Sequence, residues 1–431
     1  MNRRTLKRLD AELSGFLEEM FGGMGRRERR EAMRAYVAGL LLDGERKSIV
    51  PMAARLVDDE GEVQAMRQRL QECVTISGWP AAEVWRRLAV HVEREMPGVE
   101  AYVIDDTGFP KKGKHSVGVQ RQYSGTLGRI DNCQVAVSTH LASEQGSACI
   151  GMDLYLPESW TSDRARRLKA GVPEDAEFLE KWRMALAQLD RALDAGLGKH
   201  VVLADAGYGD ITDFREQVSE RGLLFVVGVS SVLVAWPPEA QLRLPPPSAT
   251  GRKPTRLRDD SHPPKSIAKI AEGLRFSTVR WREGSRGWQA SRFAAAWVHT
   301  AHRHGVGAKP GPGVWLLVEW PSEEKAPTRY WLSSLPEGTS LRTLVRLAKL
   351  RWRVERDYQD MKGEVGLDHY EGRTWPGFQH HVTLVAVAHA FLALRRALFP
   401  PDEMDAPGGP TPASAGPAAL ARRLSDVPAP L

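Results

Sequence analysis

The chain has 431 residues and a formal net charge of +6; the length predicts two or three domains, and the charge favours a polyanionic partner such as nucleic acid. Its three cysteines, Cys73, Cys133 and Cys149, are too few and too scattered for a disulfide framework or a cysteine zinc site. No run of about 18 apolar residues predicts a membrane span, and the N-terminus does not predict an export signal. We expect a cytoplasmic protein with no membrane partner.

The first part of the chain, residues 1–97, predicts a helical domain. Apolar residues recur at helical spacing in residues 29–44, 62–74 and 81–95. The arginines between residues 26 and 30 alternate with glutamates, so a solvated helix face is favoured there over a phosphate contact.

Residues 98–234 predict the first part of an α/β domain. Short β-rich runs separated by turn residues predict an antiparallel meander: "AYVID", "VGVQRQY", "QVAVSTHLA" and "CIGMDLYLP". A long helical stretch, the strand "HVVLAD", a second helix and the strand "LLFVVGV" follow. Strands followed by strand-helix alternation indicate a mixed sheet, so the predicted fold class is α/β.

The rest of the chain predicts an insertion and a helical end. Residues 235–336 begin with a stretch from Ala235 to Ser266 that is rich in Pro and charge and predicts a loop, and continue with tryptophan-bearing segments that predict strands. Residues 337–399 predict two helices that complete the α/β domain, the first from about Ser340 to Gly363. Residues 400–431 are rich in Pro and Ala and predict a flexible tail.

Three acidic residues are candidates for chemistry. Asp105 ends "AYVID" and Asp205 ends "HVVLAD", and carboxylates at the ends of two strands can be neighbours in a sheet. Glu355 lies beside the apolar stripe of the predicted helix, with Arg351 and Lys362 along the same flank. The spacing leaves simpler interpretations open, because a strand-end Asp often forms a turn and Glu355 can pair with the two cations.

Two aspartates and a glutamate on two strands and a helix are what a two-metal phosphoryl-transfer site requires. Mg²⁺ prefers oxygen ligands, and two such ions activate the attacking oxygen and stabilise the leaving oxygen. Cations beside the acids would hold a DNA backbone that carboxylates alone repel. The cations that follow Asp105 are Lys111, Lys112 and Lys114.

Longer motifs carry a resemblance to a known family. They occupy residues 103–143, 154–173, 201–210 and 347–375. In these motifs the chain resembles the bacterial insertion-sequence transposases of the DDE superfamily, and the similarity extends from about Glu45 to Leu398. The resemblance implies an RNase H-like mixed sheet that a β-rich insertion interrupts before the last catalytic helix. It also implies that the helical N-terminal domain binds DNA.

The resemblance assigns roles to individual residues. The catalytic acids and metal ligands that it implies are Asp105, Asp205 and Glu355. For the first of the family's metal-binding aspartates, Asp105 is preferred and Asp106 is the alternative. Arg351 and Lys362 lie at the spacing of the family's helix signature, whose tyrosine position holds Ala348 here. This departure removes the support for a DNA contact by that tyrosine and leaves the three acids unaffected.

Further residues are expected to bind DNA. They are Lys111, Lys112, Lys114, Arg121, Arg351, Lys362 and Trp288. In relatives that form a DNA hairpin, an aromatic residue of the insertion can stack on a displaced base, which is worth about 1–3 kcal/mol. Trp281, Trp288 and Trp297 are the candidates, and core packing is the expected role of most of them.

The sequence therefore predicts a DNA transposase that cuts and pastes an insertion sequence. Its expected cofactors are two Mg²⁺ ions, for which Mn²⁺ can substitute. Its expected partners are the terminal inverted repeats, target DNA and a second copy of the chain. Two alternatives stay open: a catalytically silent DNA-binding protein derived from a transposase, and an RNase H-like nuclease without strand transfer.

Overall fold

The computed structural model describes residues 3–126, 128–244, 257, 259–283, 287–302 and 309–399. These residues belong to two compact units. Unit 1 comprises Met1–Glu100, Asp105–Gly198 and Arg353–Leu431, and unit 2 comprises Ala101–Ile104 and Lys199–Trp352. The predicted tail, residues 400–431, lies outside the described residues.

The N-terminal part of unit 1 is helical, which confirms the prediction from apolar periodicity. Its helices are α1 (Arg3–Phe21), α2 (Arg27–Leu41), α3 (Ile49–Leu56), α4 (Val63–Thr75) and α5 (Ala81–Glu95), with a 3-10 turn η1 (Glu60–Glu62) before α4. Their apolar faces are buried, as at Leu17, Val37 and Leu88. Burial of these faces, more than helix propensity, stabilises helices of this length.

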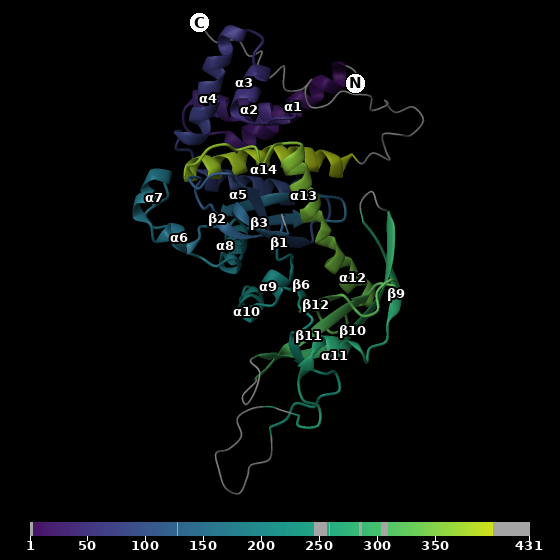
Figure 1. Ribbon diagram of the computed structural model, residues 1–431. Helices are drawn as coiled ribbons and strands as arrows, with labels where there is room; N and C mark the ends of the chain where they lie inside the picture. Colours follow the sequence, from purple (N-terminus) through teal and green to yellow (C-terminus); the bar gives the residue numbers. More distant parts are fainter. Residues whose placement is uncertain are drawn as a thin grey trace. The chain divides into compact units, whose positions relative to one another are not determined.

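Helix α14 (Trp375–Leu398) lies at the centre of unit 1. It packs against α2, α4, α5 and strand β4 (Ser147–Leu154), and Figure 1 shows it in yellow between helices α1–α4 and the strands. Of the described helices, only α14 is long and apolar enough to cross a membrane, and 78% of its most apolar window is buried. Helices that are apolar all round are typical of a protein core, so its burial accounts for its composition.

The strands of unit 1 include the predicted antiparallel pairs, but they do not follow a simple meander. They are β2 (Gln120–Ser124), β3 (Arg129–Ala142), β4 and the second part of β1 (Ala101–Pro110). Strand β3 pairs with β2 through its first residues and with β4 through its last, while β1 is the neighbour of β3 and not of β2. Helices α5 and α8 (Lys181–Asp194) pack on β3, and α6 (Glu158–Thr161) and α7 (Arg164–Ala170) follow β4.

Unit 2 contains a mixed sheet. The first residues of β1, β5 (Val201–Ala204) and β6 (Phe225–Val229) are parallel neighbours. The predicted tryptophan-bearing strands then continue the sheet in antiparallel order as β12 (Arg329–Ser333), β11 (Lys309–Trp320), β10 (Trp288–His302) and β9 (Ser277–Arg282). The helices are α9 (Ala206–Gly209), α10 (Thr212–Glu220), α11 (Ile267–Ala271) and α12 (Leu341–Leu350). This arrangement confirms the predicted α/β fold class.

The Pro-rich stretch contains strand pairing at both of its ends, so the prediction of a loop without regular structure is wrong there. Strand β7 (Val234–Trp236) pairs with β8 (Lys265–Ser266) and with the edge of β10. These strands are too short to leave a periodic signal, but their backbone groups complete the hydrogen bonds at the edge of the sheet. Residues 245–256 and 258 of this stretch lie outside the described residues.

The helix predicted from Ser340 to Gly363 is two helices. Helix α12 ends at Leu350, Arg351 is its C-cap, and α13 (Trp352–Gly363) follows. The apolar stripe keeps helical spacing through the break, so periodicity alone does not reveal it. The break coincides with the passage of the chain from unit 2 to unit 1, where α13 buries Val354 and Met361.

Candidate active site

Strand β1 carries two adjacent acids in its middle. Residues 101–104 are buried, Asp105 and Asp106 are half-buried, and the strand continues to Pro110, so the prediction that the strand ends at Asp105 is wrong. The Asp105 carboxylate accepts a hydrogen bond from the backbone N–H of Asp106 at 2.8 Å. The Asp106 carboxylate binds the ammonium group of Lys181 at the start of α8. A protein cation therefore compensates Asp106.

Strand β5 of unit 2 is followed directly by Asp205. Within this unit β1 and β5 are parallel, and their last paired residues are Val103 and Leu203. Counting forward, Asp105 and Asp205 are each the second residue beyond that pair. Asp205 is also the N-cap of α9, and its carboxylate accepts from the N–H of Gly207 at 2.9 Å. A turn-forming role and a ligand role are therefore compatible at this residue.

The turn after Asp205 packs directly on the neighbouring strand. A Cβ at Gly209 would lie 1.9 Å from the carbonyl oxygen of Gly228 in β6, so only glycine fits. The fixed turn holds the backbone of Asp205 at the carboxyl end of β5.

Helix α13 presents two acids to different surroundings. Glu355 is exposed, whereas Asp357, two residues later, is 4% exposed. The Asp357 carboxylate accepts from Nδ1 of His140 at 2.6 Å and from the hydroxyl of Ser147 at 2.7 Å. Nε2 of His389 lies 3.8 Å from the same carboxylate. These contacts fix one side of α13 to β3, β4 and α14.

The surroundings of the buried His140–Asp357 pair in unit 1 favour the charged form of both side chains. Burial alone would lower the pKa of His140, but Cys149 and the hydrogen-bonded Asp357 outweigh it and raise the pKa to about 10. Burial alone would raise the pKa of Asp357, but the hydrogen bond and charge of His140 lower it. An imidazolium donates from both ring nitrogens, so Nε2 donates to the hydroxyl of Ser138 at 2.9 Å.

The hydrogen bonds continue from His140 through Ser138 to Tyr358 of α13, a residue on which Asp105 acts electrostatically. The hydroxyl oxygens of Ser138 and Tyr358 lie 2.6 Å apart. Because the Ser138 oxygen accepts from His140, its own hydroxyl hydrogen is available to donate to Tyr358. Burial raises the pKa of Tyr358 well above its ordinary value, and the charge of Asp105 raises it further. Asp105 therefore lies within electrostatic reach of Tyr358, which is one helical turn beyond Glu355.

The predicted DNA-binding lysines have different surroundings. The ammonium of Lys111 donates to the carbonyl oxygen of Tyr370 at 2.9 Å, and burial lowers its pKa. The ammonium of Lys362 donates to the carbonyl oxygen of Gly108 at 3.1 Å, and burial lowers its pKa as well. Lys112 and Lys114 are exposed. Two of the lysines thus stabilise the ends of β1 and α13, while the other two face solvent.

The remaining predicted residues lie on other elements. Arg121 is exposed on β2, and Arg351 is half-buried at the junction of α12 and α13. Among the three candidate tryptophans, Trp288 is 60% exposed at the start of β10. Trp281 packs edge-on against Phe293, and Trp297 packs edge-on against Trp315.

The chemistry of the predicted acids fits a hard divalent cation, because carboxylate oxygens are its preferred ligands. Asp105 and Glu355 belong to unit 1, and Asp205 belongs to unit 2. Within the ranges that the structure describes, no three His, Cys, Asp or Glu side chains converge closely enough to hold a metal ion.

Sequence reasoning missed the buried cluster of His140, Ser147, Asp357 and His389. One signal was available: "VSTH" places three consecutive polar residues in a strand that is otherwise apolar, and buried polar side chains need partners. The partner residues lie on α13 and α14, more than 200 positions away along the chain, so the pairing itself was not readable.

Comparisons with known proteins agree with the resemblance. The family model described as "DDE superfamily endonuclease" matches residues 19–288, a range that contains Asp105 and Asp205 and ends before Glu355. A curated protein of Microchaete diplosiphon, "Probable transposase for insertion sequence element IS701", is 27% identical over 205 residues. The aligned part is 47% of this chain and 49% of that protein, so the chain spans about half the length of this relative.

Proposed function

This chain belongs to the DDE superfamily of endonucleases, and we propose that it is a DNA transposase that binds, cuts and transfers the ends of an insertion sequence. The similarity to a probable transposase supports this choice among the activities of the superfamily. We assign Asp105, Asp205 and Glu355 as the catalytic acids.

The observation that carries the proposal is the family match over residues 19–288. The electrostatic effect of Asp105 on Tyr358 supports placing Asp105 beside α13. Tyr358 follows Glu355 by three residues on α13, and residues three apart lie on the same side of a helix. The register of β1 and β5 supports adding Asp205, since each aspartate is two residues beyond the pair formed by Val103 and Leu203. The family match supports both aspartates independently, because it spans them.

The proposed reaction is phosphoryl transfer at the ends of the element. An oxygen of water forms a bond to phosphorus, the bond to the 3′ oxygen breaks, and a 3′-hydroxyl is released. The oxygen of that hydroxyl then forms a bond to a phosphorus of target DNA, the bond from this phosphorus to the target's own 3′ oxygen breaks, and a 3′-hydroxyl of the target is released. Two Mg²⁺ ions, or Mn²⁺ in their place, would when bound polarise the phosphate and activate the attacking oxygen. The chain supplies three carboxylates for them, held by β1, by the turn after β5 and by α13.

The proposed partners follow from this reaction. The substrate is double-stranded DNA, first the terminal inverted repeats and then the target, and the net charge of +6 favours a polyanion. Two ends have to be cut in one complex, so we propose a homodimer on DNA, acting in the bacterial cytoplasm on the nucleoid.

The test is cleavage of a DNA fragment that carries the repeats flanking the protein's own gene. Purified protein and Asp205→Ala are each incubated with the fragment and Mg²⁺, and the products are resolved on a denaturing gel. We expect cuts at the repeat boundary with the unaltered protein alone, and equal binding of the fragment by both. A fully active Asp205→Ala protein would overturn the assignment of the acids.

The same assay separates the alternatives. Cleavage without joined products in the presence of target DNA identifies a nuclease without strand transfer. Binding without metal-dependent cleavage identifies a silent DNA-binding protein.

A further inference from the structure

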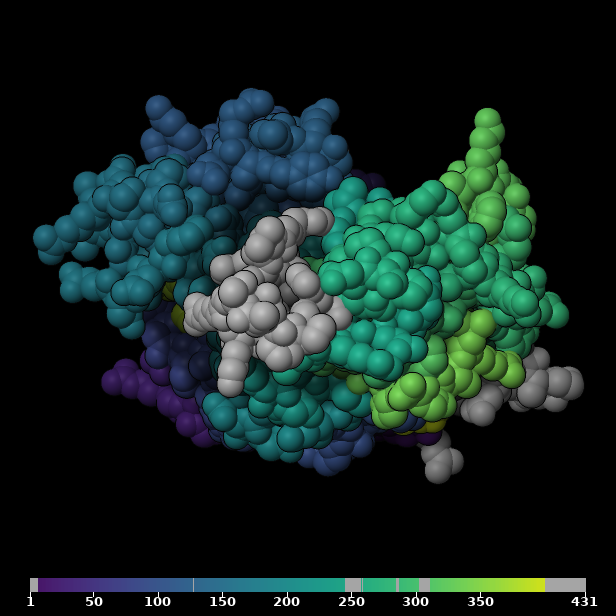
Figure 2. All heavy atoms as spheres, turned by 90° about the horizontal axis from the view of Figure 1, so that it is seen from below, coloured from purple at the N-terminus to yellow at the C-terminus, as the bar shows by residue number. Residues whose placement is uncertain are grey.

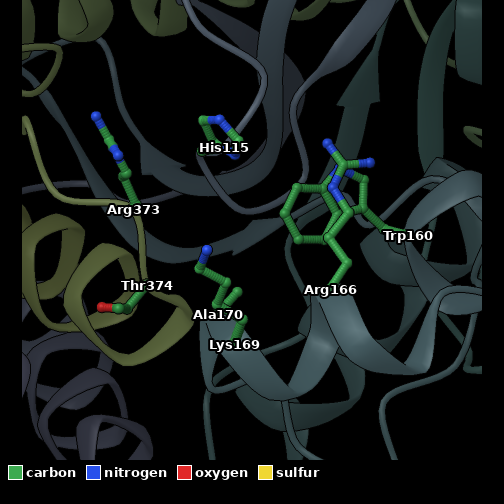
Figure 3. Close-up of a pocket in the computed structure, with 7 residues that line it drawn as sticks. All are labelled: His115, Trp160, Arg166, Lys169, Ala170, Arg373 and Thr374. Carbon is green, nitrogen blue, oxygen red and sulfur yellow. The ribbon is translucent and has the colours of Figure 1, made fainter.

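Two neighbouring cavities in unit 1 differ in their charge. The first has a volume of about 160 Å³ and is lined by His115, Trp160, Arg166, Lys169, Ala170, Arg373 and Thr374. Figure 3 shows the side chains of His115, Arg166, Lys169 and Arg373 around this space, each ending in nitrogen. No acidic residue lines it. The second cavity, of about 530 Å³, shares His115 and Arg373 with the first.

The second cavity contains its own acids. Glu371 lines it and binds the guanidinium of Arg46 at 2.7 Å, and Asp368 also lines it. Both acids act on Lys111, a third cation of this cavity. Two carboxylates of the protein therefore lie among the cations of the second cavity, whereas none lines the first, where Asp163 acts on Arg166 from outside the lining.

The first cavity is built on a fixed cation. The guanidinium of Arg166 lies 3.7 Å from the centre of the Trp160 ring and donates to the carbonyl oxygen of Lys114 at 2.7 Å. Trp160 is fully buried, and its indole N–H donates to the carbonyl oxygen of Val119. Burial lowers the pKa of Arg166, so this group carries its charge at a cost. A guanidinium held in this way is ready to bind phosphate without losing further freedom.

The neighbouring cations have no acidic partner. Within the described part of the chain, Lys169 and Arg373 form no ion pair, and both are exposed. Figure 2, a view from below, shows the blue-green segment around α6 and α7 at the surface on the left. Clustered like charges repel one another, and an anion in the cavity would relieve that repulsion.

We propose that this cavity binds a backbone phosphate of the DNA substrate, with Arg166, Lys169 and Arg373 as its ligands. The proposal rests on the proposed function and adds a contact site to it. The loop from residue 111 to 119 joins the cavity to β1, which carries Asp105.

The test compares two double variants that remove the same charge. Lys169→Ala with Arg373→Ala alters the cavity, and Arg183→Ala with Arg191→Ala alters exposed arginines of α8 that are paired with Glu180 and Asp153. Binding to the repeat-bearing duplex is measured over a range of salt concentrations. We expect the cavity variant to bind at least about tenfold more weakly and its salt slope to fall by about 1, with little change in the control.

Two further measurements sharpen the result. Ethylation of single phosphates along the repeat should identify a position at which binding of the unaltered protein weakens while binding of the cavity variant is unaffected. Lys169→Arg with Arg373→Lys, which keeps both charges, should restore most of the binding. Equal weakening in the two double variants, or none in either, would overturn the proposal.

The proposed function and the cavity can fail separately. A protein that cuts the repeats, while its cavity variant binds them normally, refutes the cavity alone. A protein that binds the repeats but never cuts them refutes the transposase, while the binding comparison still tests the cavity. If millimolar inorganic phosphate raises the melting temperature only when Lys169 and Arg373 are present, and duplex binding is unchanged in their absence, the cavity serves a free phosphate ion instead.

Discussion

Helix α13 places Glu355 and Asp357 two residues apart in opposite environments. Asp357 has protein partners on three other elements and is 4% exposed, whereas Glu355 is exposed to solvent. A buried carboxylate with an imidazolium and a hydroxyl as partners serves the fold, because its charge is compensated inside the protein. Glu355 is instead accessible from solvent, which a ligand of a metal bound with DNA requires.

The same contrast applies to the two acids of β1, and it gives the largest expected effect. Asp106 is bound by Lys181, whereas Asp105 acts on Tyr358 beside α13. We expect Asp105→Asn to reduce cleavage by about 10³-fold or more, since the electrostatic stabilisation lost at a metal site is several kcal/mol. Asp106→Asn should only impair cleavage. Rates on the repeat-bearing fragment measure both, and equal losses would leave the contrast without support.

Replacing Asp357, the buried acid of α13, should lower the stability of the fold. Asp357→Asn leaves the buried His140 imidazolium without its counter-charge, so we expect unfolding to cost about 3–5 kcal/mol less than in the unaltered protein. Gln359→Ala, an exposed change on the same helix, is the matched control and should alter stability by less than about 0.5 kcal/mol. Urea unfolding followed by circular dichroism measures both. A stable Asp357→Asn protein would show that the cluster is not structural.

The buried pair should also give stability a pH dependence. The pKa of His140 is raised to about 10 from about 6.5, so its contribution is complete below about pH 6.5 and declines as pH rises through 10. The pKa of Asp357 is lowered, so its contribution is lost as pH falls below about 4. Unfolding free energies of the unaltered protein and His140→Gln should therefore converge between pH 7 and 10. A constant difference would contradict ionisation of the pair.

The smallest effect is expected in unit 2. Trp288 is 60% exposed, so Trp288→Ala should change the stability by less than about 0.5 kcal/mol. If Trp288 stacks on a displaced base, the same variant weakens the bound intermediate by about 1–3 kcal/mol. Trp297→Ala, which removes a ring packed on Trp315, should instead lower stability. Cleavage products and urea unfolding of the two variants separate the roles.

Much of the fold was predictable because its signals are local. Apolar periodicity located the N-terminal helices, and β-rich runs located strands β1–β4 and the tryptophan-bearing strands. The break at Arg351 was not predictable, because α12 and α13 share one continuous apolar stripe. The extension of β1 to Pro110 was also missed, since two aspartates and three lysines there suggest the end of a strand.

For the site, the sequence supplies candidate residues and not their geometry. Motifs and resemblance selected Asp105, Asp205 and Glu355 without showing what holds them. Ser138 contacts His140, two positions away, and its hydrogen bond to Tyr358 joins residues 220 positions apart. The pairing of these polar residues with α13 and the cation-rich lining of the cavity at Arg166 both depend on which side chains the fold brings together, so neither was readable from local sequence.

The most direct test of the account measures two quantities on two variants of one helix. Glu355→Gln and Asp357→Asn are each assayed for metal-dependent cleavage of the repeat-bearing fragment and for urea unfolding. We predict that Glu355→Gln loses cleavage by about 10³-fold or more and unfolds like the unaltered protein, whereas Asp357→Asn loses stability. A Glu355→Gln protein that cuts the fragment at the normal rate would contradict the assignment of Glu355 to the active site.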